Sequence, residues 1–210
     1  MVQKCIVFNF NGVLVNTKSL AVDLYNQIAE KKGYKQIQPE QIETLSRLSI
    51  QNRCKVLGVP LYQMPIIGIT IKSRYQDAFS KLDAVDGISK LLLSLKDQDY
   101  KIGFITSNSQ RATRAFLQHN QIDCFDFEYY SFNPFTKFRD LDLFVHKYNI
   151  KKENLIYVGD ELRDIKAGNR AGIKTIGISW GYDSSSLLQQ GNPAYIVTKP
   201  NDILNFLEGE

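Results

Sequence analysis

The sequence predicts an α/β protein with a doubly wound, Rossmann-like parallel sheet and an inserted α-helical cap subdomain. Short apolar runs alternate with amphipathic helical patterns along most of the chain, as they do in consecutive βαβ units. The runs are apolar on both faces, which indicates strands covered by helices on the two sides of a parallel sheet. One interval, residues 17–83, contains helical patterns and no convincing strand.

Six segments have the length and composition of strands, namely 4–10, 101–107, 125–130, 154–160, 174–180 and 194–197. Amphipathic helices are predicted between most of them, at 87–98, 110–120, 141–148 and 161–172. Ligands of such sheets bind beyond the carboxyl ends of the strands. The residues that follow each strand are therefore the first candidates for a functional site.

The interval after the first strand is predicted to hold four helices, at 20–33, 39–48, 50–58 and 68–82. β-branched residues in the stretch PIIGITIK weaken the helical pattern of the last one. Such an insert would lie directly over the carboxyl end of the first strand, where a lid belongs. We therefore expect a core of residues 1–16 and 84–210 and a cap of residues 17–83, with a hinge near 83–87.

Composition and charge limit the class of protein. The chain of 210 residues is 43% hydrophobic and 23% charged, as in ordinary globular proteins. Its net charge of +4 comes from scattered lysines and arginines, which favours small anions over nucleic acid as ligands. Cys5, Cys54 and Cys124 have no metal-ligand spacing and are expected to be reduced thiols. Without a signal-like leader or a membrane-length apolar run, a cytoplasmic protein with no membrane partner is expected.

Polar and ionisable residues follow several of the predicted strands. They are Asn9 and Asn11, Thr106 and Ser107, Lys137 after a strand and a loop, and Asp160 with Asp164. The carboxyl ends of parallel strands converge, so hydroxyls, an ammonium group and carboxylates would share one crevice. That combination suits a phosphate group and a divalent metal ion. Asparagine is unexpected there, because its amide is neither a useful base nor a nucleophile.

These residues resemble the motifs of the haloacid dehalogenase-like hydrolases. Residues 9–14, NFNGVL, are similar to the pattern Asp-x-Asp-Gly-Thr/Val-Leu, except that both aspartates are asparagine. Thr106 is similar to the second motif, Lys137 to the third, and residues 159–161 with Asp164 to the fourth. The stretches ISWGYDSSSLL and NPAYIVTKPNDIL also resemble phosphoglycolate-phosphatase-like members. The resemblance covers essentially the whole chain and points to the helical-cap branch.

The resemblance implies a phosphatase mechanism for the aspartate form of the chain. In active members the first aspartate attacks phosphorus and forms an aspartyl-phosphate, and the second protonates the leaving group and then activates water. Thr106, main-chain amides near Ser107, and Lys137 would stabilise the phosphoryl oxygens. The substrate would be a small phosphomonoester, either phosphoglycolate-like or a sugar phosphate.

The resemblance also implies a Mg²⁺ cofactor, held by residues at positions 9, 11, 160 and 164. In this chain Asn9 can offer an amide oxygen, but it cannot become an acyl phosphate by the family's route. Asn11 keeps its main-chain oxygen and loses the proton shuttle. Asn16, at a position that is commonly aspartate, is expected to have a turn or capping role. We therefore expect Mg²⁺ binding to be weakened by Asn9 and the chain as written to be inactive or impaired.

Each of these residues also has a purely structural interpretation. Asn9 and Asn11 suit a tight turn, and Thr106 with Ser107 suits the start of a helix. Asp160 and Asp164 suit a turn and a helix N-terminus. Lys137 suits a solvated surface, with Lys147, Lys151 and Lys152 as rival matches to the third motif.

Several functional alternatives stay open at this point. The chain is either an altered form of an active phosphatase or a natural non-catalytic relative. Such a relative would bind a phosphorylated ligand or have a regulatory role. A doubly wound interaction module without a phosphate site, like a receiver domain, is a third possibility, and the long insert argues against it. Arg47 and Arg53 are candidates for contacting an anionic substrate tail, or are solvated helix arginines. A monomer or a homodimer is expected.

Overall fold

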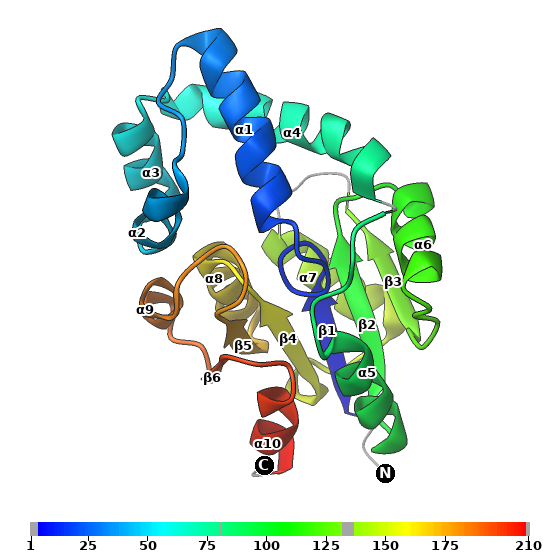
Figure 1. Cartoon of the computed structure of the whole chain (residues 1–210). Helices are drawn as coiled ribbons and strands as arrows, with labels where there is room; N and C mark the ends of the chain where they lie inside the picture. The colour runs from blue at the N-terminus through cyan, green and yellow to red at the C-terminus, as the bar shows by residue number, and fades with distance from the viewer. Residues whose placement is uncertain (1–3, 80, 132–136, 209–210) are drawn as a thin grey trace.

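The computed structural model describes residues 4–79, 81–131 and 137–208. Within them, six strands form one parallel sheet in the order β3-β2-β1-β4-β5-β6 (Figure 1). The strands are β1 (Cys5–Asn9), β2 (Lys101–Thr106), β3 (Phe127–Tyr130), β4 (Leu155–Gly159), β5 (Lys174–Ile178) and β6 (Tyr195–Val197). The predicted α/β class and all six predicted strands are confirmed.

The two faces of β1 explain why its apolar run is continuous. The side chains of Ile6 and Phe8 belong to one buried cluster, and those of Cys5 and Val7 belong to another. Successive side chains of a strand point to opposite faces of the sheet. A central strand with helices on both sides therefore has no polar face.

Helices of the core cover the two faces. Residues of α5 (Ile88–Asp97), α6 (Gln110–His119) and α10 (Asp202–Glu208) pack in the cluster of Ile6 and Phe8. Residues of α7 (Lys137–Tyr148) and α8 (Leu162–Ala171) pack in the cluster of Cys5 and Val7. The short elements of the core are α9 (Ser185–Leu188), η3 (Lys152–Asn154) and η4 (Gln189–Gly191).

The segment between β1 and α5, called the helical segment below, is helical as predicted. It contains α1 (Lys18–Lys32), η1 (Pro39–Gln41), α2 (Ile42–Ser46), α3 (Ile50–Leu57), η2 (Leu61–Gln63) and α4 (Met64–Phe79). Residues of α1 to α4 share a buried cluster of their own, which includes Tyr25, Leu45, Cys54 and Ile67. Figure 1 shows these helices beyond the carboxyl ends of the strands, where an insert can cover a ligand site.

The last of these helices begins earlier than its pattern predicts. α4 runs without a break from Met64, through the β-branched stretch that disfavours a helix locally. Pro65 lies in its first turn, where a missing N–H group costs nothing. Ile67 is buried in the helical cluster and Ile71 packs against it. Burial of these side chains therefore outweighs the weak intrinsic helix propensity.

No single helix among the described residues is long and apolar enough to cross a membrane. The segments Ile50–Leu57 and Leu61–Tyr75 reach that threshold only when they are taken together, and the chain bends by 109° between them.

Candidate active site

A cleft of about 290 Å³ lies at the carboxyl ends of the strands. It brings together residues that are far apart in the sequence, and the candidate residues that line it are Asn9, Asn11, Thr106, Ser107 and Lys137. Met64 and Ile71 of α4 and Tyr182 of the core line the same cleft. The core thus supplies the polar residues of the lining, and the helical segment supplies two apolar ones.

Asn9 connects two oxygen atoms at the end of β1. Its Nδ2 donates to the main-chain oxygen of Asn11 and to Oδ1 of Asp160, and both distances are 3.0 Å. The second contact joins β1 to the end of the neighbouring strand β4. The amide nitrogen of Asn9 therefore lies between a carbonyl oxygen and a buried carboxyl group. A carboxylate at position 9 could not donate either of these hydrogen bonds.

Asn11 is paired with Asn108, a residue that the motifs do not indicate. Asn108 Nδ2 donates to Asn11 Oδ1 at 2.7 Å, and Asn11 Nδ2 donates to Asn108 Oδ1 at 3.3 Å. The main-chain N–H of Asn108 also donates to Oγ1 of Thr106 at 3.1 Å. Asn108 therefore ties the ends of β1 and β2 together. Its position two residues after Thr106 is the only sequence signal for this role.

Asp160 is completely buried at the end of β4. Its Oδ1 accepts from Asn9 and its Oδ2 accepts from the main-chain N–H of Tyr182 at 3.0 Å. Burial raises the pKa of this carboxyl group, as do the nearby carboxyl groups of Glu161 and Asp164. The ammonium group of Lys137 acts in the opposite direction. Crowding of carboxyl groups away from water thus favours the neutral form of Asp160.

Two glycines make room for the Asp160 side chain. A Cβ atom at Gly12 would lie 2.1 Å from Asp160 Oδ2, and one at Gly181 would lie 2.2 Å from Asp160 Cβ. Gly12 also has a φ of 82°, a left-handed conformation that suits glycine. Glycine is therefore required at position 12 by its left-handed backbone conformation and by its close packing against Asp160.

Lys137 lies at the start of α7 and forms an ion pair with Asp164 at the start of α8. Its Nζ is also 3.5 Å from Oε2 of Glu161. Asp164 accepts from the Tyr157 hydroxyl at 3.2 Å and from the main-chain N–H of Glu161 at 3.1 Å. The structure thus brings Lys137 to the cleft together with the acidic turn.

Arg163 adds a second cation to the cleft. Its Nε and Nη2 lie 2.8 and 2.5 Å from Oε2 of Glu161. Glu161 and Arg163 both line the cleft. Glu161 was matched to the fourth motif but was not assigned to the site, and Arg163 was not a candidate. The only sequence signal for Arg163 is its place in the acidic turn after β4.

Three acidic side chains could hold a metal ion. One carboxylate oxygen each from Asp160, Glu161 and Asp164 lies within 4.8 Å of the others. The main-chain oxygen of Asn11 points toward the same region, because it shares the Asn9 amide with Asp160. Oxygen donors of this kind suit a hard divalent cation such as Mg²⁺. The donor set therefore fits the ion, with an amide in place of one carboxylate.

The other candidate residues lie away from the cleft. Arg53 donates to the main-chain oxygens of Leu45 and Ser46, at 2.8 and 3.2 Å, and forms an ion pair with Asp183. Arg47 has a side chain that is 61% exposed and pairs with Glu43 one helical turn away. Asn16 is exposed.

Relatives of known sequence cover nearly the whole chain. The chain is 25% identical over 203 residues to a phosphoglycolate phosphatase from Synechococcus elongatus, and the match covers 96% of each chain. It is 23% identical over 211 residues to a pyrophosphatase from Bacillus mycoides, covering 96% of this chain and 95% of the relative.

Solved structures share the fold over a similar extent. A predicted phosphatase from Clostridium acetobutylicum superposes with a TM-score of 0.80 at 18% identity, covering 100% of both chains. A haloacid dehalogenase-like family hydrolase from Streptococcus pneumoniae superposes with a TM-score of 0.78 at 19% identity, covering 98% of both chains.

The family model described as haloacid dehalogenase-like hydrolase matches residues 6–178. This match extends from β1, through the helical segment, to the end of β5. The chain therefore belongs to the haloacid dehalogenase-like hydrolase family.

Proposed function

We propose that this chain binds small phosphomonoesters in the cleft and hydrolyses them far more slowly than a form with aspartate at positions 9 and 11. The observation that carries the proposal is the hydrogen bonding of the two asparagines. Asn9 uses its amide nitrogen to join Asn11 and Asp160, and Asn11 is paired with Asn108. Neither side chain offers a carboxylate nucleophile or a carboxylic acid to the cleft.

The remaining residues suit a bound phosphate group. Thr106 ends the strand next to β1 and Ser107 follows it, and Lys137 lines the same cleft. Hydroxyl, main-chain N–H and ammonium donors stabilise phosphoryl oxygens without taking part in bond making. These groups do not depend on the chemistry at positions 9 and 11.

The change from carboxylate to amide also alters the charge that a phosphate meets. Two unit charges about 4 Å apart repel each other by on the order of 4 kcal/mol at an effective dielectric constant near 20, before counterions reduce it. Asn9 removes one such charge next to the phosphate site. Phosphate binding should therefore depend less on a metal ion than it does in the aspartate form.

Asp160, Asp164, the main-chain oxygen of Asn11 and the amide oxygen of Asn9 would hold Mg²⁺. When bound, the ion would screen the negative charge of the phosphate from the acidic turn. Asn9 must turn its amide to present oxygen, and this breaks its two present hydrogen bonds. The chain's affinity for Mg²⁺ should therefore be lower than that of the aspartate form.

The relatives support small phosphorylated molecules as the ligand class, because those named above are a phosphoglycolate phosphatase and a pyrophosphatase. We also propose that residues 17–83 act as a cap over the core of 1–16 and 84–210. Met64 and Ile71 of α4 support this division, because they line the cleft together with core residues.

The decisive experiment compares four proteins on 4-nitrophenyl phosphate with Mg²⁺. They are the chain as written, Asn9→Asp, Asn11→Asp and the double variant. Loss of catalytic groups that act as a unit costs about a millionfold in other enzymes. We therefore expect hydrolysis by the double variant, little by either single variant, and none measurable by the chain as written.

Asn16→Asp is the matched control, because it makes the same substitution at an exposed position outside the cleft. It should hydrolyse no more than the chain as written. Mass spectrometry must exclude deamidation at the Asn11-Gly12 step in every sample. Hydrolysis by the unmodified chain at the rate of the double variant would refute the proposed loss of activity.

A further inference from the structure

We propose that the ligand of the cleft is a phosphomonoester with an apolar body, such as an aryl or alkyl phosphate, and that this body occupies a second cavity within the helical segment. The inference rests on the proposed function for the phosphate end of the ligand. It narrows the ligand class, because glycolate and sugar phosphates are polar throughout.

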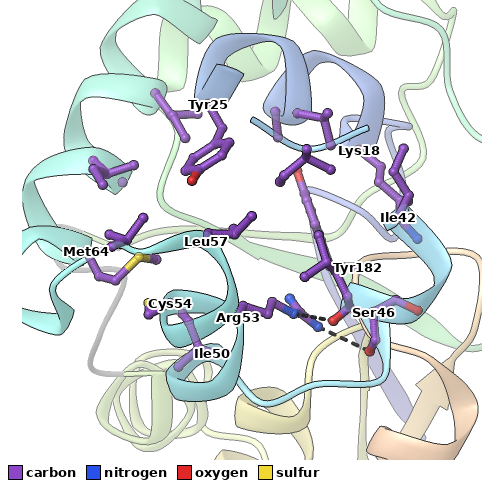
Figure 2. A pocket seen from close by; sticks show the side chains of 18 residues that line it. Lys18, Tyr25, Ile42, Ser46, Ile50, Arg53, Cys54, Leu57, Met64 and Tyr182 are labelled. Carbon is purple, nitrogen blue, oxygen red and sulfur yellow. Dashed lines mark hydrogen bonds between the residues drawn. The ribbon is translucent and has the colours of Figure 1, made fainter. Parts of the chain in front are cut away.

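The second cavity has a volume of about 210 Å³ and lies among α1, α2, α3 and α4. Figure 2 shows Tyr25, Leu57, Cys54 and Met64 around it. Most of its surface comes from aliphatic and aromatic side chains. An apolar cavity of about 150 Å³ accepts a benzene ring in another protein, so this one has room for an aryl group.

The polar side chains that line this cavity are already hydrogen-bonded within the protein. Tyr25 donates to the main-chain oxygen of Lys35 at 3.0 Å, and Ser46 donates to that of Glu43 at 2.7 Å. Lys18 donates to the main-chain oxygen of Gly181 at 3.0 Å.

The other two polar side chains lie where the helical segment meets the core. Arg53 is held by two carbonyl groups of α2 and by Asp183, as the dashed lines to the carbonyl groups in Figure 2 illustrate. The Tyr182 hydroxyl is 2.9 Å from the hydroxyl of Thr17. A sugar placed here would lose hydrogen bonds to water and find its potential partners engaged. An apolar group makes no hydrogen bonds to water and would therefore lose none.

The cavity adjoins the phosphate cleft. Met64, Ile71 and Tyr182 line both. Met64 and Ile71 come from α4, whereas Tyr182 comes from the loop after β5 and extends toward the helical segment in Figure 2. The proposed ligand would place its phosphate near Lys137 and its apolar body among the four helices, next to these shared residues.

Binding of five probes to the full chain tests this assignment. Isothermal titration calorimetry gives the dissociation constants of 1-naphthyl phosphate, phenyl phosphate, phosphoglycolate, inorganic phosphate and 1-naphthol. Burial of apolar surface should make 1-naphthyl phosphate bind at least about tenfold more tightly than phosphoglycolate, with phenyl phosphate between them. Inorganic phosphate should bind and compete with both esters.

Two variants place larger side chains at positions that line the cavity. A side chain at Gly68 finds no heavy atom within 4 Å of its Cβ, and leucine favours a helix more than glycine does. Gly68→Leu, and Ala21→Phe in α1, should each raise the dissociation constant of 1-naphthyl phosphate about tenfold and leave that of inorganic phosphate unchanged. Ser73→Leu is the matched control, because it adds a leucine at an exposed position of α4 outside the cavity. It should change neither constant.

The outcomes separate this inference from the proposed function. Equal affinities for 1-naphthyl phosphate and phosphoglycolate would overturn the inference and leave the phosphate site intact. Equal affinities for 1-naphthol and 1-naphthyl phosphate, both insensitive to Lys137→Ala, would also overturn it, because the cavity would then act independently of the cleft. Failure of inorganic phosphate and of every phosphomonoester to bind would refute the proposed function itself.

Discussion

The side-chain amide of Asn9 donates hydrogen bonds to the main-chain oxygen of Asn11 and to Asp160 Oδ1, each at 3.0 Å. The family resemblance implies that both acceptor oxygens are ligands of a metal ion. The amide nitrogen thus joins two oxygens that would otherwise share a cation. An aspartate at position 9 would remove both hydrogen bonds and place a second carboxylate beside a buried one.

Asn9→Asp should therefore destabilise the metal-free protein and strengthen its Mg²⁺ binding. Loss of two hydrogen bonds beside a buried charge costs on the order of 1–2 kcal/mol, which corresponds to about 2–8 °C in Tm for a chain of this length. Thermal melts in chelator measure the first effect, and calorimetric titration with Mg²⁺ measures the second. Asn16→Asp should change neither quantity. A higher Tm for the Asn9→Asp protein in chelator, or an unchanged Mg²⁺ affinity, would contradict the role given to Asn9.

Asn108→Ala should weaken the junction between β1 and β2. It leaves the Asn11 amide without its partner, at a cost of about 1–2 kcal/mol in the free energy of unfolding. In the double aspartate variant it should lower kcat more than it changes KM, because Asn108 positions residue 11 and does not bind substrate. Urea unfolding and steady-state kinetics give the two readouts. Asn52→Ala, at an exposed position of α3, is the control, and an equal effect of both variants would remove Asn108 from this role.

Arg53→Met should loosen the attachment of the helical segment to the core. Arg53 is 21% exposed and joins α2 to Asp183, whereas Arg47 is 61% exposed. Loss of hydrogen bonds to a charged group costs about 2 kcal/mol, and Arg47→Met should stay within about 0.5 kcal/mol. Urea unfolding of both variants, in a double-mutant cycle with Asp183→Asn, tests this. A coupling energy near zero would mean that the ion pair is not formed in solution.

Variants of Arg47 and Arg53 also test which residues determine substrate choice. If either arginine contacts an anionic substrate tail, its removal from the double aspartate variant should change the ranking over a panel of phosphomonoesters. The contacts of Arg53 with Leu45, Ser46 and Asp183 lead us to expect lower stability with an unchanged ranking.

Asp126 should contribute a pH-dependent part of the stability. It accepts from Lys96, Lys101 and the main-chain N–H of Ile102, at 2.7, 2.8 and 3.0 Å. Burial acts to raise the pKa of Asp126, but these hydrogen bonds outweigh it and hold the pKa below its ordinary value of 3.8. The stabilisation is thus complete above the unfolded pKa and is lost as the pH falls through the folded pKa.

Asp126→Asn should therefore be less stable than the parent at pH 7, and the difference should shrink below about pH 4. Urea unfolding at pH 7, 5 and 3.5 measures this difference. Asp123→Asn, which makes the same substitution at a nearby exposed position, is the control. A difference that grows toward low pH would mean that the pKa of Asp126 is raised in the folded state.

The sequence by itself determined the six strands, the helical segment between β1 and α5, and the convergence of Asn9, Thr106 and Lys137 on one cleft, with Asp160 bonded to Asn9. Each of these follows from local hydrophobic periodicity and from the geometry of parallel sheets. The tertiary structure alone decided the early start of α4 at Met64, because buried packing outweighs local propensity there.

The tertiary structure alone also decided which side chains form hydrogen bonds with each other. Asn11 and Asn108 are separated by 97 residues, and Asn9 and Asp160 by 151. Side-chain partners so distant depend on sheet register and on rotamers, which no local pattern encodes. The apolar cavity among α1 to α4 has the same origin, because its shape depends on how four separate helices pack.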